Sequence, residues 1–493
     1  MRRLILMVLL AVVADTGSAQ NAQLAASAGP HLTLDEAIKL ALERNKSVKV
    51  DAFSRGIARA NLLEAKGRFD SALTFRRSYT EDGSPAGLGS WMTQLSQTDD
   101  YGVSLDGITP WGLSYSFGGS AQNRRGTANG FTDNYSSFGG ITVTQPLLRG
   151  FGFGANLFGV RIAKADRSIS DWSFRQSVIF TVTQVVIAYS DLTLAKENLR
   201  INRRARDLVD SLVESNERRF TAGTISESDV LQARAQAASR GEQILFSERA
   251  VRDTENNLRH LIGEETFSLS GPMLVLDPPE LSEVEVNLAE DLKTALGSRP
   301  DYRAARLGLV KLRAGESLAR NQLLPRLDVV GSYGYSGFDR DFAASRRMVT
   351  DEDHRSYSAG VVVSVPLTFA EGRGRARAAR LGLRQGEADL DRLAQDIALS
   401  ITSAAGQIET TRQRVVATRR AYELASQTLE GEQKKLQAGA TSTFVVLGLQ
   451  NSLTSAESNL SRALADQRRA YAIYEREIGV TLVRRKIELK SED

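Results

Sequence analysis

Residues 434–446 read KKLQAGATSTFVV and residues 218–230 read RRFTAGTISESDV, so one turn sequence occurs twice in the chain. In both copies an Ala-Gly pair is followed by small hydroxyl residues. The glycine can adopt the left-handed conformation that closes a helix, and a serine three residues later can cap the next helix. Each stretch therefore predicts the turn of a helical hairpin. The residues expected at the two turns are Ala222, Gly223, Thr224, Ala438, Gly439 and Ala440.

Long tracts without proline surround these turns, at residues 147–271 and 367–493. Proline disrupts a helix interior by about 3 kcal/mol or more, so such tracts can hold long helices. After each turn, hydrophobic residues return at every seventh position, with Gln467 as the polar exception, which is the spacing of a coiled-coil seam. A generic coiled-coil scaffold would show the same pattern. We expect helices over 152–220, 225–263, 373–436 and 441–479.

The duplication extends beyond the turns. Residues 34–73 align without a gap with residues 288–327, and identical pairs include Leu34/Leu288 and Glu36/Glu290. A fixed internal repeat defines the organisation of a fold before any local pattern does. We place the first structural repeat at 20–271, a linker at 272–287 and the second repeat at 288–493. Shorter helices are expected at 33–70 and 288–323.

Between the helical parts of each repeat, the sequence becomes rich in Gly, Ser, Tyr and Phe and alternates with a period of two. This pattern predicts strands within 72–146 and within 327–366. Residues 101–117 form an apparent extra hairpin, which either enlarges the sheet or lies outside it. The residues expected where strands give way to helices are Pro146, Gly150, Gly152, Pro325 and Pro366.

Aromatic residues concentrate in the strand segments, as expected for the girdles of a membrane β-barrel at the bilayer interface. A soluble β-sandwich is the alternative. The candidate interface residues are Trp91, Trp111, Tyr115, Tyr333 and Tyr357.

The first 19 residues show the order of a secretory signal peptide, with two arginines, an apolar run and small residues ending at Ala19. A membrane anchor is the alternative, but the apolar run is shorter than the roughly 20 residues of a spanning helix. The most apolar later stretch, 178–189, is interrupted by polar residues, and we expect no spanning helix there. An exported chain can then enter a membrane as β-strands.

Four to six strands are too few for a transmembrane barrel, because about eight are the minimum. Several copies of the chain would therefore share one barrel, and the helices with the seven-residue hydrophobic repeat would pack against helices of neighbouring copies. The predicted fold class is mostly α with a membrane β-barrel portion: an internally duplicated chain whose long coiled-coil helices form a hollow cylinder.

Across essentially the whole mature sequence, the chain resembles the TolC-like outer-membrane efflux protein family. The resemblance is carried by LDEAIKLALERN at 34–45, its echo at 288–302, LLPRLDVVGSY at 323–333, QPLLRGFG at 145–152, and the two turns. It implies a homotrimer whose strands form one shared transmembrane barrel in outer-membrane lipid, continuous with a periplasmic α-barrel tunnel. The family usually contributes four strands per protomer. It also implies that a periplasmic adaptor (membrane fusion) protein and an inner-membrane pump dock at the helical turns.

Some members of that family carry carboxylates shortly after the second turn, lining a constriction. Here Val445 and Gly448 occupy those places, and only Asp229 in the first repeat is acidic. A carboxylate ring from the second turn is therefore not supported. We expect a gate closed by hydrophobic packing, with Thr441 and Phe444 taking part.

Other functions are disfavoured by what the sequence lacks. It has no cysteine and only three histidines, and it shows no G-x-S-x-G, H-E-x-x-H or P-loop motif, so no enzyme, cofactor or metal site is predicted. The 63 Lys+Arg nearly balance the 59 Asp+Glu, so no nucleic-acid partner is expected. The predicted function is a passive outer-membrane channel of a tripartite efflux or type I secretion system; the alternative is a periplasmic coiled-coil adaptor or scaffold.

Overall fold

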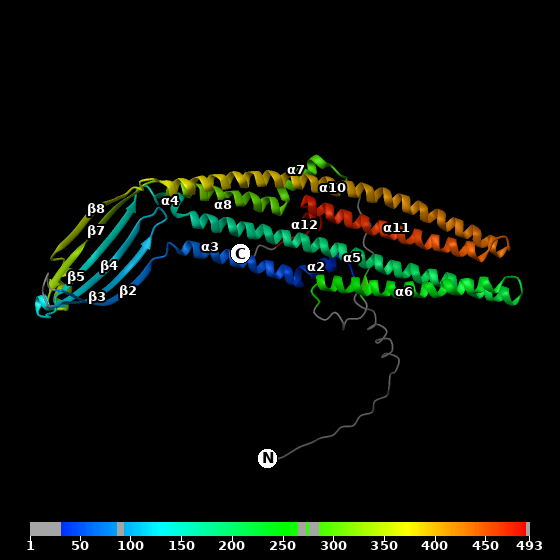
Figure 1. Cartoon of the computed structure of the whole chain (residues 1–493), viewed down its shortest axis with the longest axis horizontal. Helices are drawn as coiled ribbons and strands as arrows, with labels where there is room; N and C mark the ends of the chain where they lie inside the picture. The colour runs from blue at the N-terminus through cyan, green and yellow to red at the C-terminus, as the bar shows by residue number, and fades with distance from the viewer. Residues whose placement is uncertain (1–30, 86–92, 265–272, 276–284, 490–493) are drawn as a thin grey trace, which may run out of the picture. The chain divides into compact units, whose positions relative to one another are not determined.

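The computed structural model describes residues 31–85, 93–264, 273–275 and 285–489, and the predicted signal peptide lies outside these residues. The chain divides into two compact units. We call residues 1–52, 174–300 and 394–493 the helical unit, and residues 53–173 and 301–393 the sheet unit. Most elements of both units are labelled in Figure 1.

The first repeat begins with two helices instead of the single helix expected over 33–70. Helix α2 spans Leu34–Arg44 and helix α3 spans Lys46–Gly67. Asn45 separates them because its Oδ1 atom accepts the backbone N–H groups of Ser47 at 2.9 Å and Val48 at 3.3 Å, which caps the start of α3. Its Nδ2 atom donates to the carbonyl of Leu261 at 2.8 Å, so the break is also anchored to the rest of the helical unit.

The second repeat has the same break for a different reason. Helix α7 spans Leu288–Ser298 and helix α8 spans Pro300–Gln322, so the expected helix over 288–323 is divided at Arg299. Arg299 is extended, with φ −63° and ψ 125°. A proline disfavours the helical conformation of the residue before it, and Pro300 is well tolerated as the first residue of α8.

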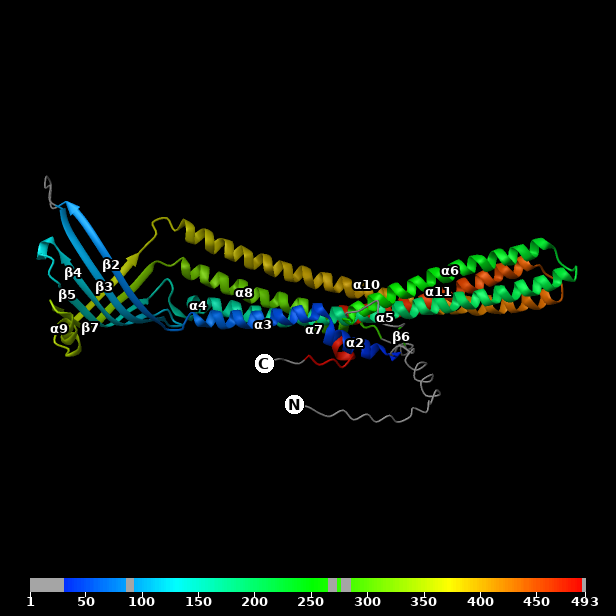
Figure 2. The same cartoon turned by 90° about the horizontal axis from the view of Figure 1, so that it is seen from below.

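Long helices follow in each repeat. The first has α4 (Gly152–Asn156), α5 (Phe158–Thr221) and α6 (Glu227–Leu261). The second has α10 (Ala370–Gln437), α11 (Thr443–Ile478) and the short α12 (Thr481–Arg484). Within the helical unit, α5 and α6 lie beside α10 and α11 (Figure 2). They pack through a cluster of buried residues: Val209, Leu212, Ala237, Leu429, Leu436, Val446 and Leu447. Two of these, Ala237 and Val446, occupy the predicted heptad positions.

A second buried cluster includes the apolar stretch of α5. Helix α5 contains an 18-residue window with a mean hydropathy of 1.6, long and apolar enough to cross a membrane by composition. However, 67% of that window is buried inside the structure. Val178, Val182 and Val185 are almost fully buried, and the Tyr189 hydroxyl donates to the carbonyl of Leu32 at 2.9 Å. These side chains form the core of the helical unit, beside the short parallel pair β1 (His31–Leu32) and β6 (Leu274–Val275).

The sheet unit contains one six-stranded sheet in the order β2-β3-β4-β5-β7-β8, with every neighbouring pair antiparallel. A 3-10 turn (Thr127–Asn129) precedes β5, and helix α9 (Phe342–Thr350) connects β7 with β8. The strands are β2 (Ala72–Pro85), β3 (Thr93–Ile108), β4 (Ser114–Gly126), β5 (Tyr135–Pro146), β7 (Arg326–Asp339) and β8 (Arg355–Ser364).

The apparent extra hairpin belongs to this sheet. The predicted segment 101–117 is part of β3 and β4, which are paired from Ser96↔Gly126 to Ile108↔Ser114. Strand β3 pairs with β2 on its other side, and β4 pairs with β5. The four strands per protomer implied by the family resemblance are thus exceeded, because the hairpin inserts between two strands that would otherwise be neighbours.

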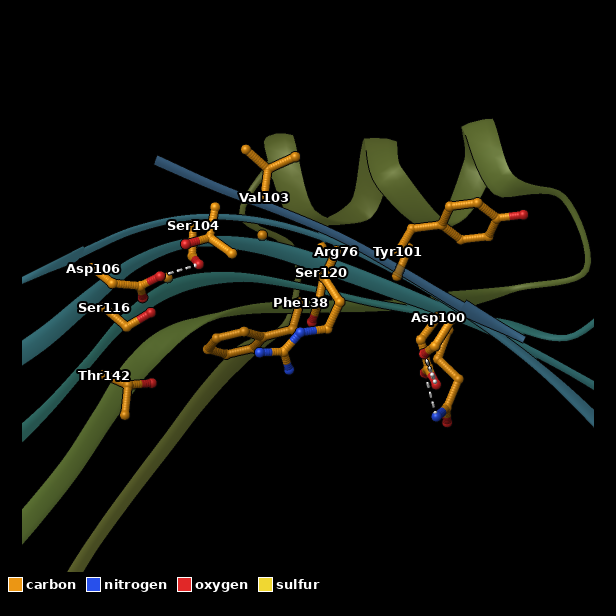
Figure 3. A pocket seen from close by; sticks show the side chains of 18 of the residues that line it. Arg76, Asp100, Tyr101, Val103, Ser104, Asp106, Ser116, Ser120, Phe138 and Thr142 are labelled. Carbon is orange, nitrogen blue, oxygen red and sulfur yellow. Dashed lines mark hydrogen bonds between the residues drawn. The ribbon is translucent and has the colours of Figure 1, made fainter. Parts of the chain in front are cut away.

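The two faces of the sheet differ in chemistry. Directly paired residues of an antiparallel sheet lie on the same face. One face is hollowed and carries small or polar residues, including Arg76, Asp106, Ser116 and Thr142, together with Phe138; we call it the concave face (Figure 3). One half of the opposite, convex face carries an apolar band: Leu73, Phe75, Tyr101, Val103, Leu105, Phe117, Ile141, Tyr333, Tyr357, Val361 and Val363. The other half carries polar residues, including Asp99 and Arg125, which form an ion pair, and helix α9 packs over part of it.

Candidate functional site

The two predicted turns close the hairpins α5–α6 and α10–α11, and we call them the tip turns. Gly223 and Gly439 have φ angles of +73° and +75°, the left-handed conformation that favours glycine. In the first, the N–H of Thr224 donates to the carbonyl of Arg219 at 2.9 Å. In the second, the N–H of Ala440 donates to the carbonyl of Lys435 at 2.9 Å. Both are glycine C-caps that satisfy the last carbonyls of a helix.

The start of the helix after each tip turn is built differently in the two repeats. Ser226 caps α6, and the Asp229 carboxylate accepts hydrogen bonds from the Ser226 hydroxyl at 2.7 Å and from the Ser226 backbone N–H at 3.2 Å. Asp229 is therefore engaged in a capping box. Ser442 makes no such side-chain bond to α11. Instead Thr441 donates to Glu432, and this bond, together with Lys435, holds the pKa of the Glu432 carboxyl below its usual range.

The remaining gate candidates lie on the exposed side of α11. Phe444 is 72% exposed and Val445 is 41% exposed, and Gly448 follows one turn later on the same side. The opposite side of this helix faces the core through buried residues, among them Val446 and Leu447. The structure therefore places three of the five gate candidates together, at the beginning of one helix.

A buried polar contact close to the tip turns was not predicted from the sequence. Asn216 in α5 is fully buried, and its Nδ2 atom donates to the Asp229 carbonyl and to the Thr443 hydroxyl, each at 3.3 Å. Thr443 is also buried, at 3% exposure. This contact joins the hairpin of the first repeat to that of the second. No local signal identifies it, because the residues are 227 positions apart.

A repeated basic pair was also overlooked. Arg218 and Arg219 precede Gly223 by the same spacing at which Lys434 and Lys435 precede Gly439. Cations in the last turn of a helix interact favourably with its dipole. Lys434 also pairs with Glu430 at 2.9 Å, which lowers the pKa of that carboxyl. The signal was visible in the quoted turns, which begin RR and KK.

The predicted junction residues gather around a buried asparagine in the sheet unit. Gly150 and Gly152 have φ angles of +83° and +86°. Asn156, 6% exposed, donates through Nδ2 to the carbonyls of Gly150 at 2.8 Å and Gly152 at 3.0 Å. The N–H of Gly152 donates to the carbonyl of Trp111 at 3.0 Å, so the turn between β3 and β4 is fixed to the same junction.

Of the three predicted junction prolines, Pro146 and Pro325 lie in this junction, whereas Pro366 does not. Pro146 ends β5 and pairs with Asp328 of β7. The Pro325 carbonyl accepts the N–H of Arg149 at 3.3 Å, so the end of α8 lies against the residues after β5. Pro366 follows β8, is exposed, and takes no part in these contacts.

The predicted interface aromatics lie in the sheet unit, except Trp91, which falls outside the described residues. Trp111 is 42% exposed in the turn between β3 and β4. The Tyr115 hydroxyl is 2.6 Å from that of Ser71. Tyr333 and Tyr357 are a directly paired couple on the convex face, and Tyr357 is 80% exposed. In Figure 3, Tyr101 and Val103 point away from the side on which Phe138 and Ser116 lie.

A sheet with an apolar band on its convex face and a polar concave face, combined with two repeated pairs of long helices, is typical of outer-membrane channel proteins. The model of the family described as outer membrane efflux protein matches residues 112–264 and 292–473. The chain therefore belongs to the outer membrane efflux protein family.

Relatives and solved structures agree with this assignment. The pyoverdine export outer membrane protein OpmQ of Pseudomonas putida is 27% identical over 62% of this chain and 63% of its own length. The alkaline protease secretion protein AprF of Pseudomonas aeruginosa is 25% identical over 69% of this chain and 68% of its own length. The chain thus spans about two thirds of the length of these relatives. The outer-membrane channel OprN superimposes with a TM-score of 0.69 at 18% identity, over 90% of this chain and 89% of its own. The CmeC channel of Campylobacter jejuni superimposes with a TM-score of 0.68 at 15% identity, over 90% of this chain and 85% of its own.

These findings confirm the predicted family and the mostly helical, duplicated fold with its antiparallel sheet. The family description agrees with the expected location in the outer membrane, and the two relatives are named for export and for secretion. The family is non-enzymatic. Tripartite assembly follows from membership of the family, whereas the particular partners and the roles of the site residues do not.

Proposed function

We propose that the chain acts as a homotrimer that forms a passive export channel through the outer membrane. The observation that carries the proposal is the six-stranded sheet, which has an apolar band on one face, a polar opposite face and two edges without a partner strand among the described residues. Six strands are fewer than the roughly eight needed to close a transmembrane barrel, so copies must combine their sheets. The polar concave face would then line a water-filled pore.

The helical tip provides a site for opening and closing. The apolar Phe444 side chain lies just after the second tip turn and is 72% exposed in the single chain. Contiguous exposed apolar residues mark places where other surfaces pack, and Phe444 is adjacent to the partly exposed Val445. In a trimer, three copies of Phe444 and Val445 would meet and exclude water and ions from the tunnel, with Thr441 and Gly448 beside them. Asp229 supports the turn through its capping box.

A periplasmic adaptor protein and an inner-membrane pump would dock at the tip turns. The two turns present the same glycine conformation and a basic pair at the same spacing, Arg-Arg in one and Lys-Lys in the other, so an adaptor could recognise both repeats with one kind of surface. Cargo would be selected by the pump, since neither tip turn contains a built ligand site.

Planar-bilayer recording of the purified protein tests the proposal. Detergent-extracted protein should contain three chains by native mass spectrometry and should produce discrete, ohmic channel steps after reconstitution. A water-soluble monomer that passes no ions would overturn the proposal and favour a periplasmic scaffold.

A further inference from the structure

We propose that the hairpin β3–β4 widens the membrane pore, because all six strands of each chain enter one barrel of eighteen strands. The contact that closes it pairs strand β2 of one copy with strand β8 of the next. This inference rests on the proposed homotrimer for the number of copies. It goes beyond that function in assigning the strand count, the interface and the bore.

Both edge strands are long and uncovered. Strand β2 has 14 residues and β8 has 10, and among the described strands each has only one neighbour. Their convex-face side chains are among the most exposed apolar groups of the sheet: Phe75 is 73% exposed, Tyr357 80% and Val361 63%. A long apolar edge attracts another strand, and in lipid its unpaired N–H and C=O groups cannot remain unsatisfied. Each edge therefore requires a partner strand.

A second copy of this chain fits both edges at once. In an all-antiparallel sheet with an even number of strands, the first and last strands run in opposite directions, so β2 and a neighbour's β8 meet antiparallel. Their faces also agree, because Leu73 and Phe75 on β2 and Val361 and Val363 on β8 are all on the convex side. Pairing within a single chain would give only six strands, below the minimum for a closed barrel.

The insertion preserves the pattern of the sheet on either side of it. Leu73, Leu105, Phe117 and Ile141 form one continuous row of directly paired residues across β2, β3, β4 and β5. Strands β2 and β5 run in opposite directions, so a sheet without the hairpin would still alternate correctly. Two strands are added without turning any side chain to the wrong face, which is the condition for enlarging a barrel.

The enlarged barrel would be open to water. At a strand spacing of about 4.8 Å and a tilt of about 40°, eighteen strands give a backbone diameter of about 36 Å, against about 24 Å for twelve. Barrels of 16–18 strands leave an aqueous channel. The middle of the concave face carries little bulk: Ser104, Gly118, Gly140 and Gly334 form one paired row, covered in part by the Phe138 ring.

Electron cryomicroscopy of the unmodified protein in lipid nanodiscs tests the inference directly. The expected image is a threefold barrel with eighteen strands and a backbone diameter of about 36 Å. A threefold barrel of twelve strands, with β3 and β4 outside it, would overturn the inference and leave the proposed function intact. A particle with one copy would overturn both.

Disulfide trapping provides a second readout, since the natural chain contains no cysteine. Thr74→Cys on β2 is combined in turn with Ser358→Cys, Gly360→Cys, Val362→Cys or Ser364→Cys, all on the concave side of β8. We expect oxidation to give covalent dimers and trimers for one or two neighbouring positions of this series. The matched control, Ser104→Cys on the interior strand β3 with the same series, should remain monomeric in denaturing gels. Cross-linking through Ser104→Cys, or through no position in a preparation shown to be trimeric, would contradict β2–β8 pairing.

Discussion

Asn216 and Thr443 belong to different repeats and are hydrogen bonded to each other, with 3.3 Å between the Asn216 Nδ2 and Thr443 Oγ1 atoms. Both side chains are buried, so neither can exchange this partner for water. The two helical hairpins are consequently joined by a polar contact as well as by the apolar cluster around Leu212 and Val446. Their relative position near the tip turns is thereby fixed within each chain.

Asn216→Ala should lower the stability of the folded chain by about 1–3 kcal/mol, because it leaves the Thr443 hydroxyl and the Asp229 carbonyl buried without their donor. The measurement is thermal unfolding of the detergent-solubilised protein. Asn202→Ala is the control: Asn202 lies in the same helix and bonds to Ser247 at 2.8 Å, but it is only half-buried. Equal shifts for the two variants would show that burial of the Asn216 contact contributes nothing.

Phe444→Ala should raise the conductance of the closed channel, because it removes the largest apolar side chain from the proposed constriction. Single-channel recording in planar bilayers measures the effect. Val416→Ala, at a residue of similar exposure on α10 (68% against 72%), should leave the conductance unchanged. An unaltered closed state in Phe444→Ala would count against hydrophobic gating at this position.

Gly479→Ala should destabilise the protein more than Gly439→Ala. Both glycines have left-handed φ angles, +80° and +75°, which cost an alanine about 1–2 kcal/mol. A Cβ atom at Gly439 would meet open space, whereas one at Gly479 would lie 3.0 Å from the Ser298 Oγ atom and 3.2 Å from the Arg299 Cα atom. The additional crowding should add about 1–3 kcal/mol. The measurement compares the thermal unfolding midpoints of the two variants. An equal loss of stability in both would exclude the contribution from crowding at Gly479.

Acid should weaken the helical unit through Glu477. Burial opposes ionisation of this carboxyl, but the hydrogen bonds from Arg476 and Arg299 outweigh it, so the pKa of Glu477 lies below its ordinary value of 4.5. Arg299 is 2.8 Å away. A depressed pKa gives stability that is fully present above pH 4.5 and is lost as the pH falls through the folded-state pKa.

The experiment compares thermal unfolding between pH 7 and pH 3. Glu477→Gln should be less stable than the natural chain at pH 7 and should lose less stability on acidification. Glu423→Gln, which alters an exposed carboxylate 3.5 Å from Arg420, should follow the natural chain. Parallel acid curves for Glu477→Gln and the natural chain would exclude this linkage.

Much of the helical architecture could be predicted because its causes are local. The absence of proline, the heptad spacing and the Ala-Gly turns are all written in neighbouring residues. The break at Arg299 was also local, since Pro300 marks it. The break at Asn45 was local only in part: its side chain caps α3, but it also bonds to Leu261, which is 216 positions away in the sequence.

The sheet was less predictable for the same reason. Alternation located strands but not their neighbours, so the place of the β3–β4 hairpin depended on pairing with β2 and β5. The junction residues Gly150 and Gly152 were recognisable as glycines, whereas Asn156, which bonds to both carbonyls, had no distinguishing signal in its own surroundings. Polar contacts between distant segments are a property of the folded chain.

The even number of strands in the sheet limits how the calibre of such a channel can evolve. Adding or losing one strand would reverse the direction of an edge, and neighbouring copies would then meet in parallel, so only the exchange of whole hairpins keeps the ring antiparallel throughout. In a symmetric ring, one inserted hairpin is counted once for every subunit. The calibre therefore changes in fixed increments, and a single genetic insertion in one gene produces a complete increment at all positions of the ring.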